Sequence, residues 1–247
     1  MQQDGTSINK FISDSGYCSR READLYLETG RVTLNGKVAR KGNRIMPGDV
    51  VKVDSQLVKN KSKPVYIAFN KPKGVTCTTD LKDKTNIISY INFKSRIFPI
   101  GRLDKLSEGL IFLTNDGDIV NKILRSANNH EKEYIVTVDK PIKSDFIKKM
   151  AEGVKILGTV TKKCFVKQEG ELKFRIVLTQ GLNRQIRRMC EALDNKVASL
   201  VRIRIMNITL KNLDKGKWRF FTESELSVIN NMTLQSNNSS SDNGMDE

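Results

Sequence analysis

Residues 101–114 read Gly101-Arg102-Leu103-Asp104-Lys105-Leu106-Ser107-Glu108-Gly109-Leu110-Ile111-Phe112-Leu113-Thr114. The first part is a polar loop bounded by glycines, and the second is an apolar run that predicts a strand over residues 109–114. In the loop, Asp104 lies between the cations Arg102 and Lys105, which favour the ionised form of its carboxylate. A nucleophile needs that form at neutral pH, whereas an Asp in a loop more often caps its own turn. Taken alone, the loop favours the capping role.

Strands and helices alternate on both sides of this loop without a regular βαβ rhythm. We expect further strands over residues 65–70, 133–138 and 172–179, and helices over residues 118–125, 145–152 and 183–193. Polar and apolar residues alternate in the last of these strands, which is typical of an antiparallel sheet with one solvated face. We therefore predict an α+β fold, with a mainly antiparallel mixed sheet and flanking helices over residues 64–232 and an Asn/Ser-rich, disordered tail over residues 233–247.

A smaller domain is expected over residues 6–54. Apolar residues at helical spacing predict a short helix that begins at Ile8. Ser19 and Glu22 form the capping-box pattern that opens a second helix, over residues 20–28. The domain therefore begins with a pair of helices.

A hairpin with an Asn35-Gly36 turn follows these helices, and the polar residues 55–63 are suited to a linker. The segment resembles the S4 RNA-binding domain through Ile8-Asn9-Lys10-Phe11-Ile12, Gly16-Tyr17-Cys18-Ser19-Arg20-Arg21-Glu22-Ala23 and Gly30-Arg31-Val32-Thr33-Leu34-Asn35-Gly36. The resemblance implies that Arg20 and Arg21 contact RNA phosphates. The alternative is that both only solvate the first helical turn. Because cations at a helix N-terminus oppose the helix dipole, an external anion explains them better.

The net charge of +15 is concentrated in one part of the chain. Residues 61–230 hold 33 basic against 18 acidic residues, whereas residues 1–60 contribute +3 and the residues from 231 contribute −3. A positive body of this size favours a polyanion as partner, with binding that weakens as salt is added. The alternative is a basic surface kept for solubility, and the charge distribution favours nucleic acid over it.

The few histidines and cysteines narrow the chemistry. His130 is the only histidine, so a Ser-His-Asp triad would depend on it, and a multi-histidine metal site cannot be built. The four cysteines are widely spaced, none in a CxxC pair, and we expect them to be reduced. No carboxylate cluster stands out either, so we predict no metal, and acid/base chemistry by Asp, Glu, Tyr or Lys. The apolar runs are too short to cross a bilayer and the start lacks signal-peptide features, so we expect a cytoplasmic protein.

Three more segments accompany the Asp104 loop: Asn70-Lys71-Pro72-Lys73-Gly74-Val75, Glu131-Lys132-Glu133-Tyr134 and Gln180-Gly181-Leu182-Asn183-Arg184-Gln185-Ile186-Arg187-Arg188-Met189. Together, and in this order, they resemble the motifs of the RsuA-type pseudouridine synthases, over about residues 5–230. Within that family the chain is most similar to the branch that modifies 23S ribosomal RNA, on residues 156–164 and 183–190. Leu106 and Arg184 depart from the family pattern, which more often has a polar or acidic residue and a histidine there.

The resemblance implies roles for three residues. Asp104 is the essential carboxylate, Tyr134 stacks near the target uracil and assists proton transfer, and Arg187 pairs with Asp104 to keep it ionised and oriented. Spacing alone would instead make Tyr134 a core residue of its strand and the arginines of the last motif a solvated helix face. The residues expected to contact RNA around the site are Arg102, Leu103, Lys105, Arg184, Gln185, Ile186 and Lys71.

The function implied by the resemblance is isomerisation of a uridine to pseudouridine. The substrate expected is structured RNA, namely 23S ribosomal RNA, with transfer RNA left open as a further substrate. Detaching uracil from C1′ of its ribose and reattaching it through C5 needs no redox carrier, nucleotide or metal, and the sequence contains neither GxxxxGK[ST] nor GxGxxG. We therefore expect an enzyme without cofactor, acting as a monomer away from membranes.

Two other classes compete with this prediction. The first is a non-catalytic S4 module that binds ribosomal RNA or ribosomes, but pure binding would not need four catalytic motifs. The second is an S4-bearing RNA methyltransferase, which would need a glycine-rich loop after a strand to hold S-adenosylmethionine. The sequence shows no such loop.

Overall fold

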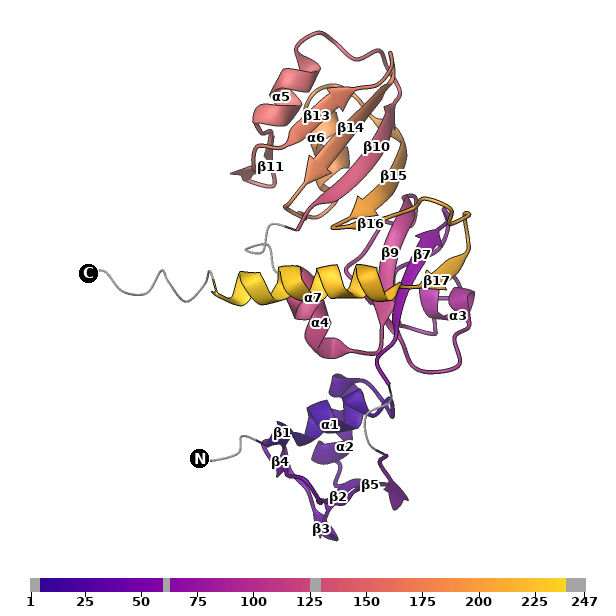
Figure 1. The fold of residues 1–247 in the computed structure, drawn as a ribbon, viewed down its shortest axis with the longest axis vertical. Coiled ribbons are helices and arrows are strands. Elements are labelled where there is room, and N and C mark those ends of the chain that lie inside the picture. Colours follow the sequence, from indigo (N-terminus) through magenta and orange to yellow (C-terminus); the bar gives the residue numbers. More distant parts are fainter. Residues whose placement is uncertain (1–4, 60–62, 125–129, 239–247) are drawn as a thin grey trace, which may run out of the picture. The chain divides into compact units, whose positions relative to one another are not determined.

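The computed structural model describes residues 5–59, 63–124 and 130–238, with side chains up to residue 232 (Figure 1). The chain divides into two compact units. The smaller contains the residues up to Val65 together with the short segments Phe93–Ile97 and Asn115–Gly117, and the larger contains the remainder. Among the described residues, no helix is both long and apolar enough to cross a membrane.

The smaller unit begins with two helices, α1 (Ile8–Asp14) and α2 (Arg20–Glu28). The predicted limits of α2 are confirmed. The predicted capping box marks its start: Ser19 accepts a hydrogen bond from the amide of Glu22 and Glu22 accepts one from the amide of Ser19, at 3.1 and 2.7 Å. Its strands are β1 (Thr6–Ser7), β2 (Val32–Leu34), β3 (Lys37–Val38), β4 (Arg44–Ile45), β5 (Val51–Val53) and β6 (Gln56–Leu57).

Two turns with left-handed backbone shape the four-stranded sheet of this unit, whose strand order is β3-β2-β5-β6, while β1 pairs with β4 separately. Asn35 and Gly36 have φ of 51° and 81° between β2 and β3, as the predicted hairpin requires. Asp54 and Ser55 have φ of 48° and 65° and turn the chain back, so that β6 pairs with β5. The start of the expected linker over residues 55–63 therefore belongs to this sheet, while residues 60–62 lie outside the described residues.

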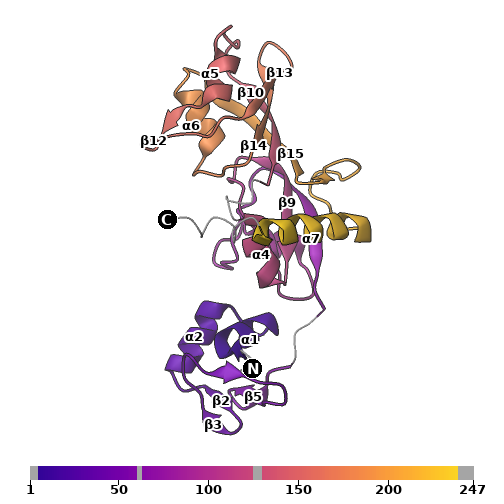
Figure 2. The same ribbon diagram turned by 60° about the vertical axis from the view of Figure 1, so that its left-hand side comes forward.

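The larger unit is built on one nine-stranded sheet, with the strand order β13-β14-β10-β15-β9-β7-β17 and with β16 beside β15 and β8 beside β9. Figure 2 labels five of these strands: β13, β14, β10, β15 and β9. The strands are β7 (Tyr66–Lys71), β8 (Phe98–Ile100), β9 (Glu108–Thr114), β10 (Lys132–Val138), β13 (Phe165–Gln168), β14 (Lys173–Leu178), β15 (Val197–Ile205), β16 (Ile208–Thr209) and β17 (Trp218–Phe220). A separate two-stranded sheet joins β11 (Lys155–Ile156) and β12 (Thr159–Val160). The helices are α3 (Ile87–Ile91), α4 (Gly117–Leu124), α5 (Phe146–Glu152), α6 (Gln185–Glu191) and α7 (Glu223–Asn238). This architecture confirms the expected α+β class and mixed sheet.

The strand pairs of this sheet that the structure describes are antiparallel except one, β15 with β9. That parallel seam consists of two residue pairs, Val201 with Glu108 and Arg202 with Gly109. Gly109 has φ of 105°, and a Cβ atom there would lie 2.2 Å from the carbonyl oxygen of Arg202. Only glycine lets the two strands approach this closely, as an isolated glycine in a strand often indicates.

Most predicted elements begin or end within a residue or two of the observed ones, but several observed elements were not predicted, among them β13, β15, β17, α3 and α7. The central strand β15 was not predicted, because Arg202 occupies one of its buried positions and obscures the alternation. Helix α7 reaches Asn238 and so extends past residue 233, where we expected the tail to begin; residues 239–247 lie outside the described residues. Ile229 of α7 belongs to the same buried core cluster as Phe112 of β9 and Ile119 of α4, and a helix that is anchored in this way can propagate further.

Candidate active site

Asp104 lies in the loop between β8 and β9, and its side chain is 32 % exposed. Its carbonyl oxygen accepts from the amide of Ser107 at 2.9 Å, which closes a tight turn just before β9. Neighbouring segments fix the same loop: the amide of Gly74 donates to the carbonyl of Lys105 at 2.9 Å, and the amide of Leu103 donates to Sγ of Cys77 at 3.4 Å. The carboxylate is therefore presented by backbone that is held from two sides.

Two arginines from the start of α6 approach this carboxylate. Arg184 caps the helix with φ of 49°, and its guanidinium lies 3.6 Å from Oδ2 of Asp104. Arg187 lies one turn further on, with Nε at 3.5 Å from the same oxygen. The structure thus brings together the pair that the family resemblance implied.

Arg187 is buried, which the alternative of a solvated helix face did not allow. Only 8 % of this residue is exposed. Its guanidinium donates to Oγ of Ser107 at 3.1 Å, to the carbonyl of Val197 at 3.3 Å and to that of Leu106 at 3.5 Å. Its Nε has no hydrogen-bond partner among the described residues, so the carboxylate of Asp104 is the anion toward which this buried donor can act.

Two cavities meet at Asp104. The first, of about 450 Å³ including space open to solvent, is lined by Arg102, Leu103, Asp104, Ser107, Leu178, Gln180, Gly181, Leu182, Arg184, Gln185, Ile186, Arg187 and Leu200. The second, of about 1270 Å³ on the same measure, adds Thr76, Cys77, Gly101, Lys105, Leu124 and Asn183 around the same aspartate. Six of the expected RNA contacts therefore line these cavities: Arg102, Leu103, Lys105, Arg184, Gln185 and Ile186.

Tyr134 lies on β10 and is 9 % exposed. It is opposite Ile176 of β14 and Arg202 of β15, so it shares a sheet face with Leu178 and Leu200, which both line the first cavity. Tyr134 itself is not among the described residues that line either cavity. Tyr134 therefore lies on the same sheet face as two cavity-lining residues, and its contact with a substrate stays a prediction.

Arg202 was missed by the sequence analysis and lies directly beside Tyr134. Its guanidinium carbon is 5.9 Å from the centre of the Tyr134 ring, and its Nε donates to the carbonyl of Leu110 at 2.6 Å. The residue is 4 % exposed, and its Nη2 has no hydrogen-bond partner among the described residues. An arginine in the buried register of a central strand would have been the signal for it.

Lys71 has a different role from the RNA contact that we expected. It is fully buried, and its ammonium donates to the carbonyls of Pro72, Val75 and Lys105 at 3.0, 2.9 and 3.5 Å. Burial lowers the pKa of this ammonium. Lys71 therefore ties the segment after β7 to the loop of Asp104, and a phosphate could not reach it without displacing these bonds.

A further cation, the half-buried Lys132, lies two residues before Tyr134 on the same face of β10. It is opposite Leu178 on β14, and its ammonium donates to the carbonyl of His130 at 3.2 Å. Burial, with a smaller contribution from Arg202, lowers the pKa of Lys132 to about 8. On this face of the sheet, Lys132 and Arg202 have no carboxylate partner among the residues that the structure describes.

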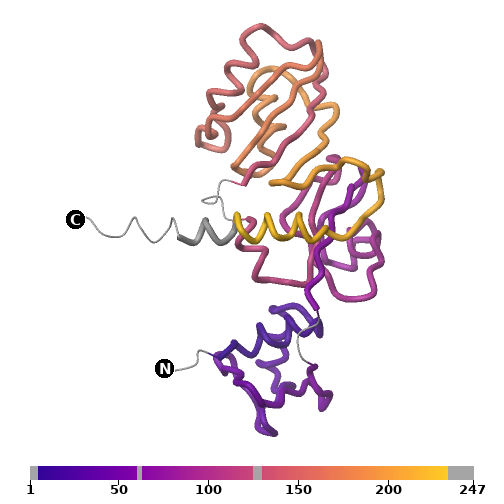
Figure 3. Tube along the Cα trace, viewed as in Figure 1, coloured from indigo at the N-terminus to yellow at the C-terminus, as the bar shows by residue number. Residues whose placement is uncertain are grey.

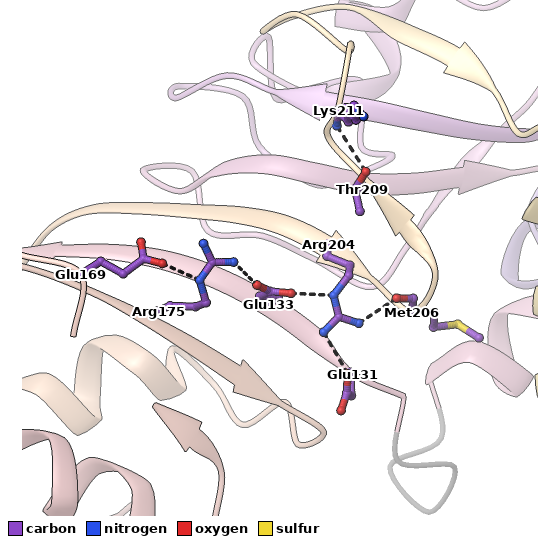
Figure 4. A network of polar contacts seen from close by, with 8 residues as sticks. All are labelled: Glu131, Glu133, Glu169, Arg175, Arg204, Met206, Thr209 and Lys211. Atoms are coloured by element: carbon purple, nitrogen blue, oxygen red, sulfur yellow. Dashed lines mark hydrogen bonds and ion pairs between the residues drawn. The ribbon is translucent and has the colours of Figure 1, made fainter. Parts of the chain in front are cut away.

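The outer face of the same strands carries a paired network (Figure 4). Glu133 of β10 accepts from Arg204 of β15 at 2.6 Å and also from Arg175 of β14. Arg175 bonds Glu169 at 2.6 Å, and Arg204 bonds Glu131 at 2.9 Å. The network joins three neighbouring strands, so it fixes the register that places Tyr134 on the cavity side.

The remaining predicted residues lie in the smaller unit. Arg20 and Arg21 are both exposed in the first turn of α2, as phosphate contacts would need to be. Among the described residues, no group of three or more His, Cys, Asp or Glu side chains is placed to hold a metal ion.

Comparison with known proteins gives consistent results. The RNA pseudouridylate synthase family matches residues 65–192, and the S4 domain family matches residues 7–51. A relative from Escherichia coli (strain K12), the "Dual-specificity RNA pseudouridine synthase RluF", is 58 % identical over 221 residues, which cover 89 % of this chain and 76 % of the relative. The "Ribosomal large subunit pseudouridine synthase B" of Buchnera aphidicola is 33 % identical, covering 91 % of this chain and 93 % of the relative.

A solved structure is similar over most of its length. The crystal structure of a pseudouridylate synthase has a TM-score of 0.66 and 27 % sequence identity, and the match covers 91 % of this chain and all of the other. The similarity therefore extends over both units of the chain.

Proposed function

This chain belongs to the RNA pseudouridylate synthase family, with an S4 domain ahead of the catalytic domain, and on that premise we propose that it isomerises a uridine of 23S ribosomal RNA. Two relatives support this substrate, since one is named for the large ribosomal subunit and the other for dual specificity. Transfer RNA is the second substrate to test. We further propose a smaller domain that extends past the expected residue 54 to Val58, a catalytic domain that includes all of α7, and a monomeric, cytoplasmic protein.

One observation supports the catalytic assignment above the others: a buried guanidinium nitrogen of Arg187, without a hydrogen-bond partner among the described residues, lies 3.5 Å from the carboxylate of Asp104 at the wall of two cavities. A charge-assisted bond across this distance requires only a small movement, and catalytic hydrogen bonds are often long before substrate binds. We propose that Arg187 holds Asp104 ionised and oriented while it acts on the ribose or the base.

The reaction breaks the bond between N1 of uracil and C1′ of ribose, turns the base, and joins C5 to C1′. The target uridine must first leave its stack, which costs a few kcal/mol that phosphate contacts and cavity contacts offset. Arg102, Lys105 and Arg184 are suited to the phosphates near the cavities, while Leu103, Gln185 and Ile186 shape the cavity walls. Tyr134 would assist proton transfer, and Arg20 and Arg21 would bind RNA from the smaller unit.

The two alternative classes are not favoured. A family match to a catalytic domain over residues 65–192, with relatives named as pseudouridine synthases, does not fit a module that only binds RNA. The same match does not fit a methyltransferase.

The test is to incubate the purified protein with 23S ribosomal RNA and no added cofactor, and then to map pseudouridine. The wild-type protein should modify a defined uridine, whereas Asp104→Asn should lose turnover by a factor of about 1000 or more, as for the loss of an essential carboxylate. Asp214→Asn, at an exposed aspartate after β16, is the matched control and should retain activity. Full activity of Asp104→Asn would overturn the assignment, and unmodified RNA with the wild-type protein would contradict the proposed substrate.

A further inference from the structure

The hairpin of β11 and β12 has an unusual turn. Leu157 and Gly158 connect the two strands with φ of 50° and 76°. Two-residue hairpin turns with both φ values positive favour Asn or Asp at the first position, because a short polar side chain tolerates the left-handed conformation. The Asn35-Gly36 turn of the smaller unit follows that preference with nearly the same angles. Leu157 does not, so its turn is strained by its own sequence.

The strain is not offset by packing of the side chain. Leu157 is 53 % exposed, and Val160 on the returning strand is 61 % exposed. A leucine in a strained conformation that also leaves its side chain in solvent is an outlier of the kind found at binding sites. The exposed side chains of Leu157 and Val160 therefore form an apolar tip that contributes little to the packing of the fold.

The charge around this tip is one-sided. Residues 153–168 contain four lysines and no acidic residue. Lys155, Lys162 and Lys163 are exposed at the hairpin and directly after it. Exposed cations around an apolar tip are complementary to a nucleic acid strand, whose phosphates take the lysines and whose unstacked bases take apolar contacts.

The hairpin is fixed to the wall of the active site. The amide of Lys162 donates to Oε1 of Gln180 at 3.1 Å, and Gln180 lines the cavity that contains Asp104. At the base of the hairpin, Val154 and Thr161 are joined by two hydrogen bonds, of 3.0 and 3.1 Å. The tip is thus held on rigid backbone, and β11 packs against α6, which supplies Arg187.

We propose that the β11–β12 hairpin is a second RNA contact of the catalytic unit, in which Leu157 and Val160 pack against an unstacked base and the three lysines bind phosphates of the strand that flanks the target uridine. This inference rests on the proposed function, since it names a further contact for the same RNA. It also explains the strained turn, because the leucine is retained for binding and not for folding.

The test uses Leu157→Asn in the full-length protein. Asn suits the left-handed turn better than Leu, so the melting temperature should not fall, while the KM for 23S ribosomal RNA should rise about tenfold, as expected when a buried leucine contact is lost. The equilibrium affinity for the same RNA should weaken by a similar factor. Val160→Thr, which keeps a β-branched residue in the strand, should weaken both in the same direction. Val228→Gln, at an exposed position of α7, is the control for loss of a surface apolar residue.

A second variant tests the lysines. Lys162→Gln combined with Lys163→Gln should reduce the slope of log affinity against log salt by about 1.5, close to two phosphate contacts on single-stranded RNA. Unchanged KM, affinity and salt slope in Leu157→Asn, Val160→Thr and the double lysine variant would overturn the inference. The hairpin tip would then not contact the RNA. If the wild-type protein binds the RNA but forms no pseudouridine, only the proposed function is contradicted. The affinities and salt slopes of the variants would still show whether the hairpin contacts the RNA.

Discussion

The two faces of strand β10 carry opposite arrangements of charge. On the outer face, Glu133 is held between Arg175 and Arg204, and each of these arginines bonds a second carboxylate. On the cavity face, Lys132 and Arg202 have no carboxylate partner among the described residues, and Arg202 leaves one buried nitrogen without a hydrogen bond. Neighbouring residues of one strand thus serve two different purposes.

The difference indicates which face was shaped for stability and which for chemistry. Buried cations without carboxylates cost stability, so a fold retains them where they have another use. The outer network satisfies its groups and joins three strands, which is what a structural network should do. Variants on the cavity face should therefore change turnover more than stability, and variants on the outer face should do the reverse.

Among variants that test the two faces, the largest effect is expected for Arg187→Met, at the edge of the cavity. Without the guanidinium, Asp104 loses the cation that orients it, so single-turnover rates should fall by about 100-fold or more while RNA affinity is largely kept. Arg188→Met, on the same helix, should retain most activity. A large loss of affinity with unchanged turnover of bound RNA would instead make Arg187 a phosphate contact.

Glu133→Gln tests whether the outer network serves stability. Burial alone would raise the pKa of Glu133, but hydrogen bonds from Arg204 and Arg175 outweigh it and hold that pKa below its usual value of 4.5. A carboxylate with a lowered pKa stabilises the fold above its unfolded pKa and loses that contribution as the pH falls through its folded pKa. The variant should lose about 2 kcal/mol of unfolding free energy at pH 7 in urea titrations, the scale of hydrogen bonds to a charged group.

The same variant should lose less stability on acidification than the wild-type protein does. Its turnover, measured on the folded fraction, should be unchanged. A turnover defect without a loss of stability would break the proposed division between the faces.

Arg202→Met should show the reverse pattern with a smaller effect. Removing a buried guanidinium that has an unpaired nitrogen should leave stability equal or higher, whereas kcat should fall about tenfold because Tyr134 loses the cation beside its ring. Arg202→Lys keeps the charge and should recover part of kcat. If both variants lower stability and spare kcat, Arg202 is a structural residue of the seam.

The smallest effect is expected for Lys132→Met and appears in the pH dependence of stability. Burial lowers the pKa of Lys132 to about 8, against 10.5 for the unfolded chain. Between these values the unfolded state binds more protons, so wild-type stability should gain with rising pH relative to the variant. Urea titrations from pH 7 to 10.5 would measure this gain. Parallel pH profiles of the two proteins would show that Lys132 is not buried in solution.

Local rules predicted the elements that depend on local contacts. Helix α2 has the predicted limits because its capping box is contained within four residues, and the Asn35-Gly36 turn follows from two residue types. The Asp104–Arg187 pair came from motif resemblance, since nothing local links residues 83 positions apart.

The features that the sequence analysis missed depend on distant segments. The sequence of the last motif was compatible with Arg187 on a solvated helix face. In the structure its guanidinium donates to Oγ of Ser107 and to the carbonyl of Val197, which come from other segments of the chain. Lys71 was expected at the RNA, but its ammonium donates hydrogen bonds to the carbonyls of Pro72 and Val75, which directly follow β7, and to that of Lys105 in the loop of Asp104. The pairing of β15 with β9 cannot be predicted from either strand alone, because it depends on Gly109 of β9 lying close to the backbone of Arg202 of β15.

The strand order also has a consequence for the order in which the protein can form. The core of the smaller unit is complete with Val58, whereas β17, at residues 218–220, must return to pair with β7 (Figure 3). A growing chain emerges from its N-terminus, so the S4 unit can form while Asp104 still lacks Arg187 and β15. A nascent or truncated chain that ends before residue 187 would therefore carry an RNA-binding unit but no assembled catalyst, and it could occupy RNA without modifying it.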